Sequence, residues 1–500
     1  MNTIDKRHVL DLMANLAPGF AVAEQESRDE ETFFKNFLPL PDHSRSLEPD
    51  ILLILGGRGA GKTELFRVLA YPRGLEALAA GHKQSLPFDP ASSLWVSGFG
   101  RTHVESKAFP APEALSQQLD TQEPLKLRAF WLGLVVGRLL NALDRSTVGT
   151  EWADSLWPEL RDCLRESSLV SRWLPLSKSR LEEVNHALDK LDAALLRSNR
   201  WLFITYDELD RLLPNYNRLS APIRELLALW LDRWRRWERI RPKIFLRNDL
   251  FREEFLAFPD ASKLRGHKVE ITWQTSSLYR LLAKRMANAG EAILNYLSSY
   301  VPRMRLRQAR VLGLLPDTSE PAFKALMETM VGPYMGPDPR KGVTYRWIPN
   351  HLQDAAGQIA PRAFLKLFAL AAESRRDKAD QLAGTFLLRP TDLQGALMET
   401  STDRIRELQE EYPWMEALKE SLKDLEVPMD RQKFGAALRN TEWSQEAERM
   451  LPVDRPIMCT RGAYVLSNEW VNAHAQSWTG QPGVNRPIDL SFQSLRSIFL

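Results

Sequence analysis

The sequence has little cysteine, no long apolar run and almost no net charge. Its two cysteines, Cys163 and Cys459, lie far apart and in no metal-ligand spacing, so structural thiols in a reducing compartment are expected. The longest apolar stretch, 130–140, contains glycine and arginine and is shorter than the roughly 20 residues of a membrane span. Lysine plus arginine number 67 and aspartate plus glutamate 64, and this balance argues against a protein that mainly coats nucleic acid.

Repeats, low-complexity tracts and an apolar leader are also missing. Because residues 1–8 are not followed by an uninterrupted apolar segment, we expect a cytoplasmic protein without a signal peptide. The eight histidines are scattered and neither cysteine has a histidine nearby, so no nuclease, protease or deaminase constellation is visible. A chain of 500 residues is about twice the size at which single cores stop growing, which predicts two or three domains.

The most informative stretch is 51–63, which joins an apolar strand, a glycine-rich loop and a helix start. Its residues match G-x-x-x-x-G-K-[ST] at every fixed position, the pattern of a phosphate-binding loop. Lys62 is expected to reach the β- and γ-phosphates of ATP, and Thr63 to give its hydroxyl to Mg²⁺. The alternative is a glycine-rich turn without a ligand. The expected nucleotide-binding residues in this loop are Gly56, Gly57, Arg58, Gly59, Ala60, Gly61, Lys62 and Thr63.

A second apolar strand, 201–206, runs directly into Asp207 and Glu208. We predict that Asp207 holds Mg²⁺ together with Thr63, and that Glu208 polarises the water that attacks the γ-phosphate. The structural alternative is an acidic helix start, where carboxylates face the helix dipole. The upstream loop on the same chain favours the catalytic interpretation.

The next apolar strand, about 243–247, ends in polar residues. A polar side chain at such a strand end is well placed to sense the γ-phosphate, and we expect Asn248 first and Arg247 second to have this role. The alternative is that Asn248 and Asp249 cap a following helix, 250–256.

The chain is predicted to be an α/β protein with a parallel-sheet, three-layer P-loop NTPase core. The expected strands are about 51–55, 94–98, 201–206, 243–247 and 268–272. The expected domains are a helical lead-in over 1–45, an ATPase core over 46–289 with a large helical insertion at about 120–197, a helical lid or C-terminal region over 290–429, and a small module over 430–500. A winged-helix-like order of elements fits this last module.

Four segments together resemble the bacterial P-loop ATPases of the STAND and KAP groups, which are relatives of AAA+ proteins. The stretch from Asp207 is similar to their Walker B signature, and Arg247 to Asp249 is similar to their sensor-1 region. The resemblance implies a nucleotide-gated switch, and many such proteins act in bacterial conflict or anti-phage defence with a protein effector. The segments are 56–63, 207–212, 245–251 and 271–273.

Pro361 and Arg362 resemble the Gly-x-Pro-Arg element of the same relatives, with Gly357 upstream. The resemblance implies that Arg362 contacts the nucleotide as a sensor-2 arginine. Arg265 lies between the last two expected strands, where the relatives place a subunit edge. It is either an arginine finger that reaches a neighbouring subunit's γ-phosphate or an ordinary surface arginine.

Three functions fit these motifs. The first is an ATPase that hydrolyses ATP and thereby changes its self-assembly or its contact with a protein partner. The second is an ATP-gated DNA-binding initiator or loader, whose affinity for DNA falls steeply with salt. The third is a small-molecule kinase, which Glu208 disfavours because a kinase excludes water rather than activating it.

Overall fold

The computed structural model divides into two compact units, which we call the sheet unit and the helical unit. The sheet unit contains Val22–Thr272 and Gln308–Gly313, and the helical unit contains Met1–Ala21, Trp273–Arg307 and Leu314–Leu500. The structure describes residues 5–17, 29–100, 106–119, 123–143, 148–215, 218–251, 258–354, 357–378 and 386–411. The module expected over 430–500 therefore lies outside the described residues.

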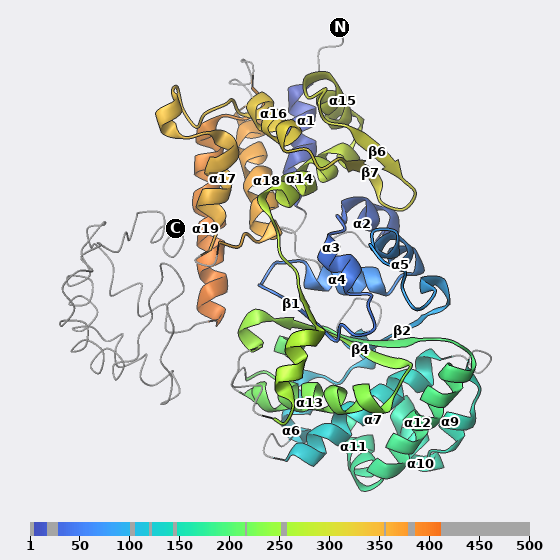
Figure 1. The fold of residues 1–500 in the computed structure, drawn as a ribbon. Coiled ribbons are helices and arrows are strands. Elements are labelled where there is room, and N and C mark those ends of the chain that lie inside the picture. Colours follow the sequence, from blue (N-terminus) through green and yellow to red (C-terminus); the bar gives the residue numbers. More distant parts are fainter. Residues whose placement is uncertain are drawn as a thin grey trace, which may run out of the picture. The chain divides into compact units, whose positions relative to one another are not determined.

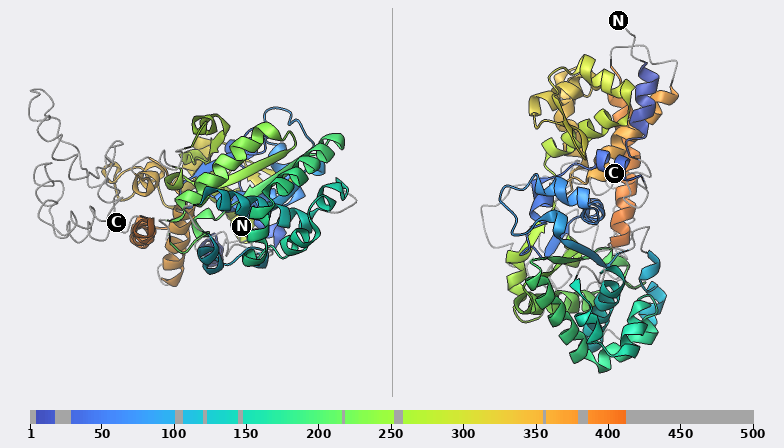
Figure 2. Two further views of the ribbon diagram at one scale, coloured as in Figure 1. Left: turned by 90° about the horizontal axis from the view of Figure 1, so that it is seen from below. Right: turned by 90° about the vertical axis from the view of Figure 1, so that its right-hand side faces the viewer.

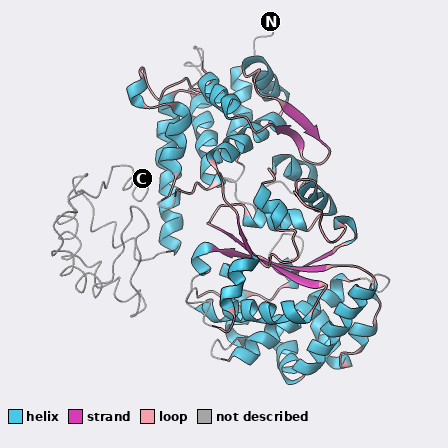
Figure 3. Ribbon diagram, viewed as in Figure 1, coloured by secondary structure: helices cyan, strands magenta, loops and turns pink. Residues whose placement is uncertain are grey.

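The sheet unit is built around a five-stranded sheet whose paired strands are all parallel and follow the order β2-β3-β4-β1-β5. Strands β1 and β3 are apolar along most of their length and buried throughout, as is usual for a parallel sheet covered on both faces. Figure 3 shows the strands in magenta between layers of helices. The strands are β1 Leu53–Gly56, β2 Leu94–Phe99, β3 Leu202–Tyr206, β4 Ile240–Arg247 and β5 Lys268–Glu270.

Helices cover both faces of this sheet. One face carries α2 Glu30–Asn36, α3 Pro41–Arg45, α4 Lys62–Leu69 and α5 Pro72–Ala79 (Figure 1). The other face carries the helices of the segment between β2 and β3, together with α13, in both Figure 1 and the right-hand view of Figure 2. These are α6 Pro112–Gln118, α7 Pro124–Ala142, α9 Glu151–Asp154, α10 Pro158–Arg165, α11 Val170–Ser179, α12 Leu181–Arg197 and α13 Ser220–Arg236.

The predicted fold class is confirmed: the unit is a three-layer α/β fold with a parallel sheet and a large helical insertion. Proline begins several of its helices, including α7 and α10, where the missing backbone N–H is not needed. Parallel neighbours bring their carboxyl ends to one edge of the sheet, so the loops after β1, β3 and β4 lie together.

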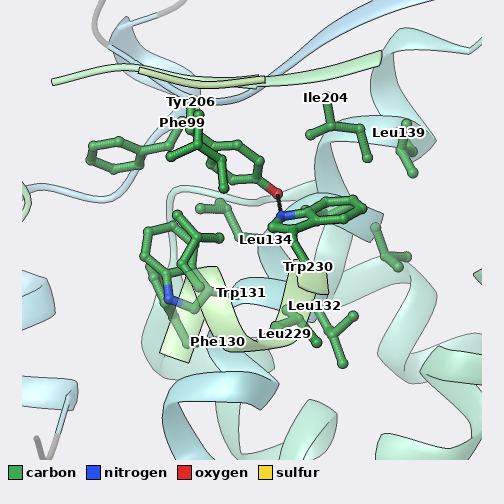
Figure 4. Packing of buried hydrophobic residues seen from close by; sticks show 14 of the residues in the cluster. Phe99, Phe130, Trp131, Leu132, Leu134, Leu139, Ile204, Tyr206, Leu229 and Trp230 are labelled. Atoms are coloured by element: carbon green, nitrogen blue, oxygen red, sulfur yellow. Dashed lines mark hydrogen bonds between the residues drawn. The ribbon is translucent and has the colours of Figure 1, made fainter. Parts of the chain in front are cut away.

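Aromatic side chains below the sheet hold the end of β3 (Figure 4). The Tyr206 hydroxyl accepts a hydrogen bond from Trp230 Nε1 at 3.0 Å, and burial raises the pKa of this phenol. Trp131 packs edge-on against Tyr206, and its Nε1 donates to the carbonyl oxygen of Pro222 at 2.9 Å. Because these rings are buried and their polar atoms are paired, Tyr206 fixes the position at which Asp207 leaves the sheet.

The helical insertion is tied to the start of β4 by one carboxylate. Asp192 in α12 accepts hydrogen bonds from the backbone N–H groups of Glu238, Arg239 and Ile240, at 3.0, 2.8 and 3.1 Å. Hydrogen bonds to a charged acceptor are stronger than neutral ones. The strand that ends at Arg247 is therefore fixed at its beginning.

The helical unit contains the N-terminal helix α1, which packs against α18, and α18 packs against α19. Residues that we expected to lead into the ATPase core thus group with the C-terminal helices. The compact units divide at Thr272 and Trp273, whereas the sequence suggested a core that runs to residue 289. The helices are α1 Lys6–Ala14, α14 Thr275–Ala289, α15 Glu291–Tyr300, α16 Glu320–Met330, α17 Thr344–Leu352, α18 Pro361–Asp377 and α19 Pro390–Glu411.

A two-stranded sheet lies between α15 and α16, in a region for which the sequence predicted mainly helices. Its strands are β6, Leu306–Ala309, and β7, Gly313–Pro316. Gly313 begins β7 with a φ of 66°, a conformation that favours glycine. None of the helices in the described ranges is long and apolar enough to cross a membrane.

Candidate functional site

The loop between β1 and α4 has the backbone of a phosphate cradle. Gly59 and Gly61 have φ values of 74° and 93°, in the left-handed region that other residues rarely adopt. Gly61 is also the N-cap of α4, so the positive end of the helix dipole faces the loop. Gly56 is buried, Gly57 is exposed, and Arg58 and Gly59 are partly buried; Ala60 is buried. The loop therefore exposes its central residues, while its buried residues Gly56 and Ala60 hold it against the protein.

Lys62 folds over this loop. Its Nζ donates to the carbonyl oxygens of Gly56 and Gly57, at 2.9 and 2.8 Å. The ammonium thus lies at the loop itself, next to the backbone N–H groups that a phosphate would meet. These hydrogen bonds to carbonyl oxygens hold the ammonium group in place. Phosphate oxygens can replace the carbonyl oxygens as acceptors without a large movement of the side chain.

Asp207, the first residue after β3, is the most perturbed group of the site. Only 3% of its surface is exposed, and the Thr63 hydroxyl donates a hydrogen bond to its carboxylate. Burial raises the Asp207 pKa to about 7, and the charge of Glu208 adds to the rise, whereas the Thr63 hydrogen bond and the charge of Lys62 oppose it. The two side chains predicted to bind Mg²⁺ are thus in direct contact.

The Asp207 carboxylate fits a metal ion. Its Oδ2 atom is buried and has no hydrogen-bond partner. A buried carboxylate oxygen without a partner is unfavourable unless a cation or proton reaches it. No group of three or more histidine, cysteine or acidic side chains that could hold a metal occurs in the part of the chain that the structure describes. A site with one hydroxyl and one carboxylate suits Mg²⁺, which keeps several waters and takes further ligands from substrate phosphates.

Glu208 has a strained backbone and a buried side chain. Its φ is 54° and its ψ is 33°, a left-handed conformation that costs on the order of 1–3 kcal/mol for a residue other than glycine. Its Oε1 accepts a hydrogen bond from Arg211 Nη1 at 3.1 Å, and the glutamate side chain is 8% exposed. Strain of this kind persists where surrounding structure imposes it. Here it directs Glu208 away from the path of β3.

Strand β4 lies between β1 and β3, so its end faces both the loop and Asp207. Arg247 is the last residue of β4, pairs in register with Gly56, and has a side chain that is 10% exposed. Its Nη1 lies 3.4 Å from Asp210 Oδ2. Asn248, which we expected to be the sensor before Arg247, is exposed and donates to Glu270 Oε1 at 2.9 Å. At the end of β4, Arg247 is therefore buried and Asn248 is exposed.

The positions of two further predicted arginines leave their roles open. Arg362 lies in the first turn of α18, in the helical unit, and its contact with a nucleotide stays a prediction. Arg265 is exposed in the 3-10 helix Ala261–His267. The alternatives for Arg265 stay open.

The sequence did not predict two contacts of the site residues. These are the contact of Glu208 with Arg211 and the contact of Arg247 with Asp210. A signal was available for Arg211, because a residue three positions after Glu208 in a helical turn lies beside it. No local signal joins Asp210 to Arg247, since the two are distant in sequence and meet only when β3 and β4 pair.

No protein-family model matches this chain, and no curated protein matches it. Among solved structures the chain is similar to the ORC2 protein of Aeropyrum pernix, in a structure of its ADPNP and ADP complexes. The sequence identity is 14%, the similarity covers 94% of this chain and 98% of that chain, and the TM-score is 0.30. A TM-score of this size carries no argument, so the P-loop NTPase fold rests on the strand order and the loop geometry. The resemblance to the STAND and KAP groups stays a prediction.

Proposed function

We propose that this chain binds ATP with Mg²⁺ and hydrolyses it, and that hydrolysis switches its contact with a partner. The observation that carries the proposal is the hydrogen bond between Thr63 and Asp207, beside a glycine loop and a carboxylate oxygen that lacks a partner. A glycine-rich turn without a ligand does not explain why a carboxylate is buried there.

Each residue of the cluster has a distinct role in this proposal. Thr63 and Asp207 hold Mg²⁺, which when bound supplies positive charge against the phosphates. Lys62 exchanges its bonds with loop carbonyls for bonds with the β- and γ-phosphates. The loop N–H groups and the start of α4 add fixed positive dipoles that do not need to reorganise during the reaction.

Glu208 is the general base that polarises the attacking water, and Arg247 stabilises charge on the γ-phosphate. This role is supported by the position of Glu208, which follows directly after Asp207 and has a largely buried side chain. Arg247 has a fixed, largely buried guanidinium, and Asp210 orients it. A donor of this kind contributes about 10²- to 10³-fold to a rate.

A switch needs a partner, and the resemblance to STAND and KAP proteins supports a protein effector or self-assembly. We therefore include a role in bacterial anti-phage defence in the proposal. The support for this part is the resemblance of the motifs, whereas ATP hydrolysis is supported by the cluster itself. A small-molecule kinase is disfavoured by the base role proposed for Glu208, because a kinase excludes water rather than activating it.

The test uses the purified full chain and two variants, one that should lose ATP binding and one that should keep ATP binding but lose turnover. Lys62→Ala removes the charge that faces the phosphates, so ATP binding weakens strongly. Glu208→Gln keeps the shape of the side chain but removes the base, so ATP stays bound while turnover falls on the order of 10²-fold or more. Equal ATP affinity of Lys62→Ala and wild type contradicts the phosphate-loop assignment. Full turnover by Glu208→Gln moves the base to another residue.

A further inference from the structure

The β6–β7 hairpin carries a concentration of positive charge that the nucleotide site does not use. Between Glu291 and Asp317 the sequence has no acidic residue and four arginines, Arg303, Arg305, Arg307 and Arg310, all of which are exposed. Among the described residues, none of these arginines forms an ion pair. This contrasts with arginines elsewhere on the surface, many of which face a carboxylate at 4.0 Å or less.

A further arginine lies close to this surface. The pKa of Arg280, in α14, is lowered first by burial and then by the positive charge of Arg307, and the carboxylate of Asp317 opposes the change. Like charges repel, so the fold keeps these guanidinium groups near each other at a cost in free energy. An anion that binds there removes the repulsion.

The hairpin is tied to α14 through strand β7. The Asn288 side chain in α14 donates to the carbonyl oxygen of Leu314 and accepts from its N–H, at 2.8 and 2.9 Å. Arg280 Nε donates to the carbonyl oxygen of Pro316 at 2.8 Å. Leu315 in β7 is therefore buried, whereas Arg307 in β6 and Arg305 just before it are exposed. Figure 1 shows the hairpin after α15.

Arg305 and Arg307 lie on one face of an extended strand. They are two residues apart, which corresponds to about 6.7 Å along a strand. Arg305 continues the pairing of β6, since its carbonyl oxygen accepts from the Asp317 N–H at 3.0 Å. Arg303 precedes them in a turn. The arrangement is a row of guanidinium groups on a rigid two-stranded ribbon.

We propose that the β6–β7 hairpin binds duplex DNA through backbone phosphates, with Arg305 and Arg307 as the principal contacts. A two-stranded β-ribbon fits the major groove of B-DNA, which is about 12 Å wide. Guanidinium groups bind phosphate through two parallel hydrogen bonds, and duplex DNA supplies one negative charge per about 1.7 Å of its axis. The uninterrupted row of arginines matches this uniform charge better than the mixed surface of an acidic protein does.

Another explanation is that the arginines protect an edge strand, because inserted charges discourage edge-to-edge aggregation. That role requires charge of either sign, whereas DNA binding requires positive charge. Charge reversal therefore distinguishes them. Arg305→Glu/Arg307→Glu keeps a charged edge and a soluble protein, and it abolishes DNA binding if the hairpin is the contact.

The experiment measures binding of a fluorescent mixed-sequence DNA duplex to the full chain at several salt concentrations, without nucleotide. The plot of log K against log salt has a negative slope, and each lost phosphate contact makes that slope less steep by about 0.9. The double variant Arg305→Gln/Arg307→Gln is therefore expected to reduce the magnitude of the slope by about 2. The control, Arg340→Gln/Arg346→Gln, removes the same charge from two exposed positions outside the hairpin, and we expect no change.

Two competitors separate the alternative partners. Duplex RNA has a deep, narrow major groove that side chains cannot read, so it is expected to compete weakly. Polyglutamate represents an acidic protein and is also expected to compete weakly. Wild-type affinity in the hairpin variants, equal competition by RNA, or preferential binding of polyglutamate overturns the proposal. Lys62→Ala should bind DNA as wild type does, so failure here leaves the ATPase proposal intact.

Discussion

Replacement of Asp207 by asparagine should stabilise the protein, and the gain should grow with pH. Burial raises the Asp207 pKa from 3.8 to about 7, so folding opposes ionisation of this carboxyl. A raised pKa of an acid means that the folded state binds the proton more tightly than the unfolded state does. The free energy of unfolding therefore falls as pH rises from about 4 to 7, and the full penalty is present above pH 7.

The size of this penalty follows from the shift. A difference of about 3.2 pKa units, at 1.36 kcal/mol for each unit, gives about 4 kcal/mol at pH 8 and less than about 2 kcal/mol at pH 5. Asparagine has nearly the same shape, keeps an acceptor for the Thr63 hydroxyl and has no charge to bury. The stability gain of Asp207→Asn should therefore be larger at pH 8 by about 2–3 kcal/mol.

The assay is urea denaturation of wild type and Asp207→Asn at pH 5 and pH 8, without nucleotide or divalent cation. Tryptophan fluorescence reports on the sheet unit, since Trp131 and Trp230 pack beneath the end of β3. Added Mg²⁺ and ATP should stabilise wild type and leave the variant almost unchanged. A gain that is the same at both pH values, or larger at pH 5, refutes the assignment of a buried, strained charge to Asp207.

Three further predictions address other parts of the structure. Arg247→Ala should lower the turnover rate by about 10²-fold with little change in ATP affinity, and Asn248→Ala should change neither; steady-state kinetics with both variants decides between the two positions. Tyr206→Phe leaves the Trp230 Nε1 group buried without its partner, so the free energy of unfolding should fall by about 1–3 kcal/mol in urea titrations, and a neutral result contradicts the role given to that bond. Arg265→Ala should hydrolyse ATP at the wild-type rate if this exposed residue is a surface arginine; an inactive variant that recovers turnover when co-assembled with Lys62→Ala shows instead a finger acting in trans.

Most strands of the sheet could be predicted because they are short apolar runs bounded by polar or turn residues, and the last, at 268–272, because polar and apolar residues alternate there. Their order could not be predicted, since parallel pairing joins segments that are distant in sequence. The hairpin was missed although Arg303 to Arg307 alternates polar and apolar residues, the pattern of a strand. The surrounding helical periodicity is longer and outweighed a pattern of a few residues.

The candidate site divides in the same way. The loop was predictable because its glycines occur at the positions where a phosphate-binding backbone needs positive φ or a close approach. The contact of Thr63 with Asp207 followed from the expectation that two strand ends meet at one edge of the sheet. The difference in burial between Arg247 and Asn248 was not predictable, because adjacent residues at a strand end face different surroundings. Which of the two senses the γ-phosphate stays a prediction.

The central claim is that the cluster at the carboxyl edge of the sheet hydrolyses ATP. The most direct measurement is phosphate release from ATP by the purified chain, with Mg²⁺ and with a chelator, alongside Lys62→Ala prepared in the same way. We predict turnover by wild type that requires Mg²⁺ and is lost in Lys62→Ala. Wild-type protein that neither binds nor hydrolyses ATP, or a Lys62→Ala variant with wild-type turnover, would contradict the account.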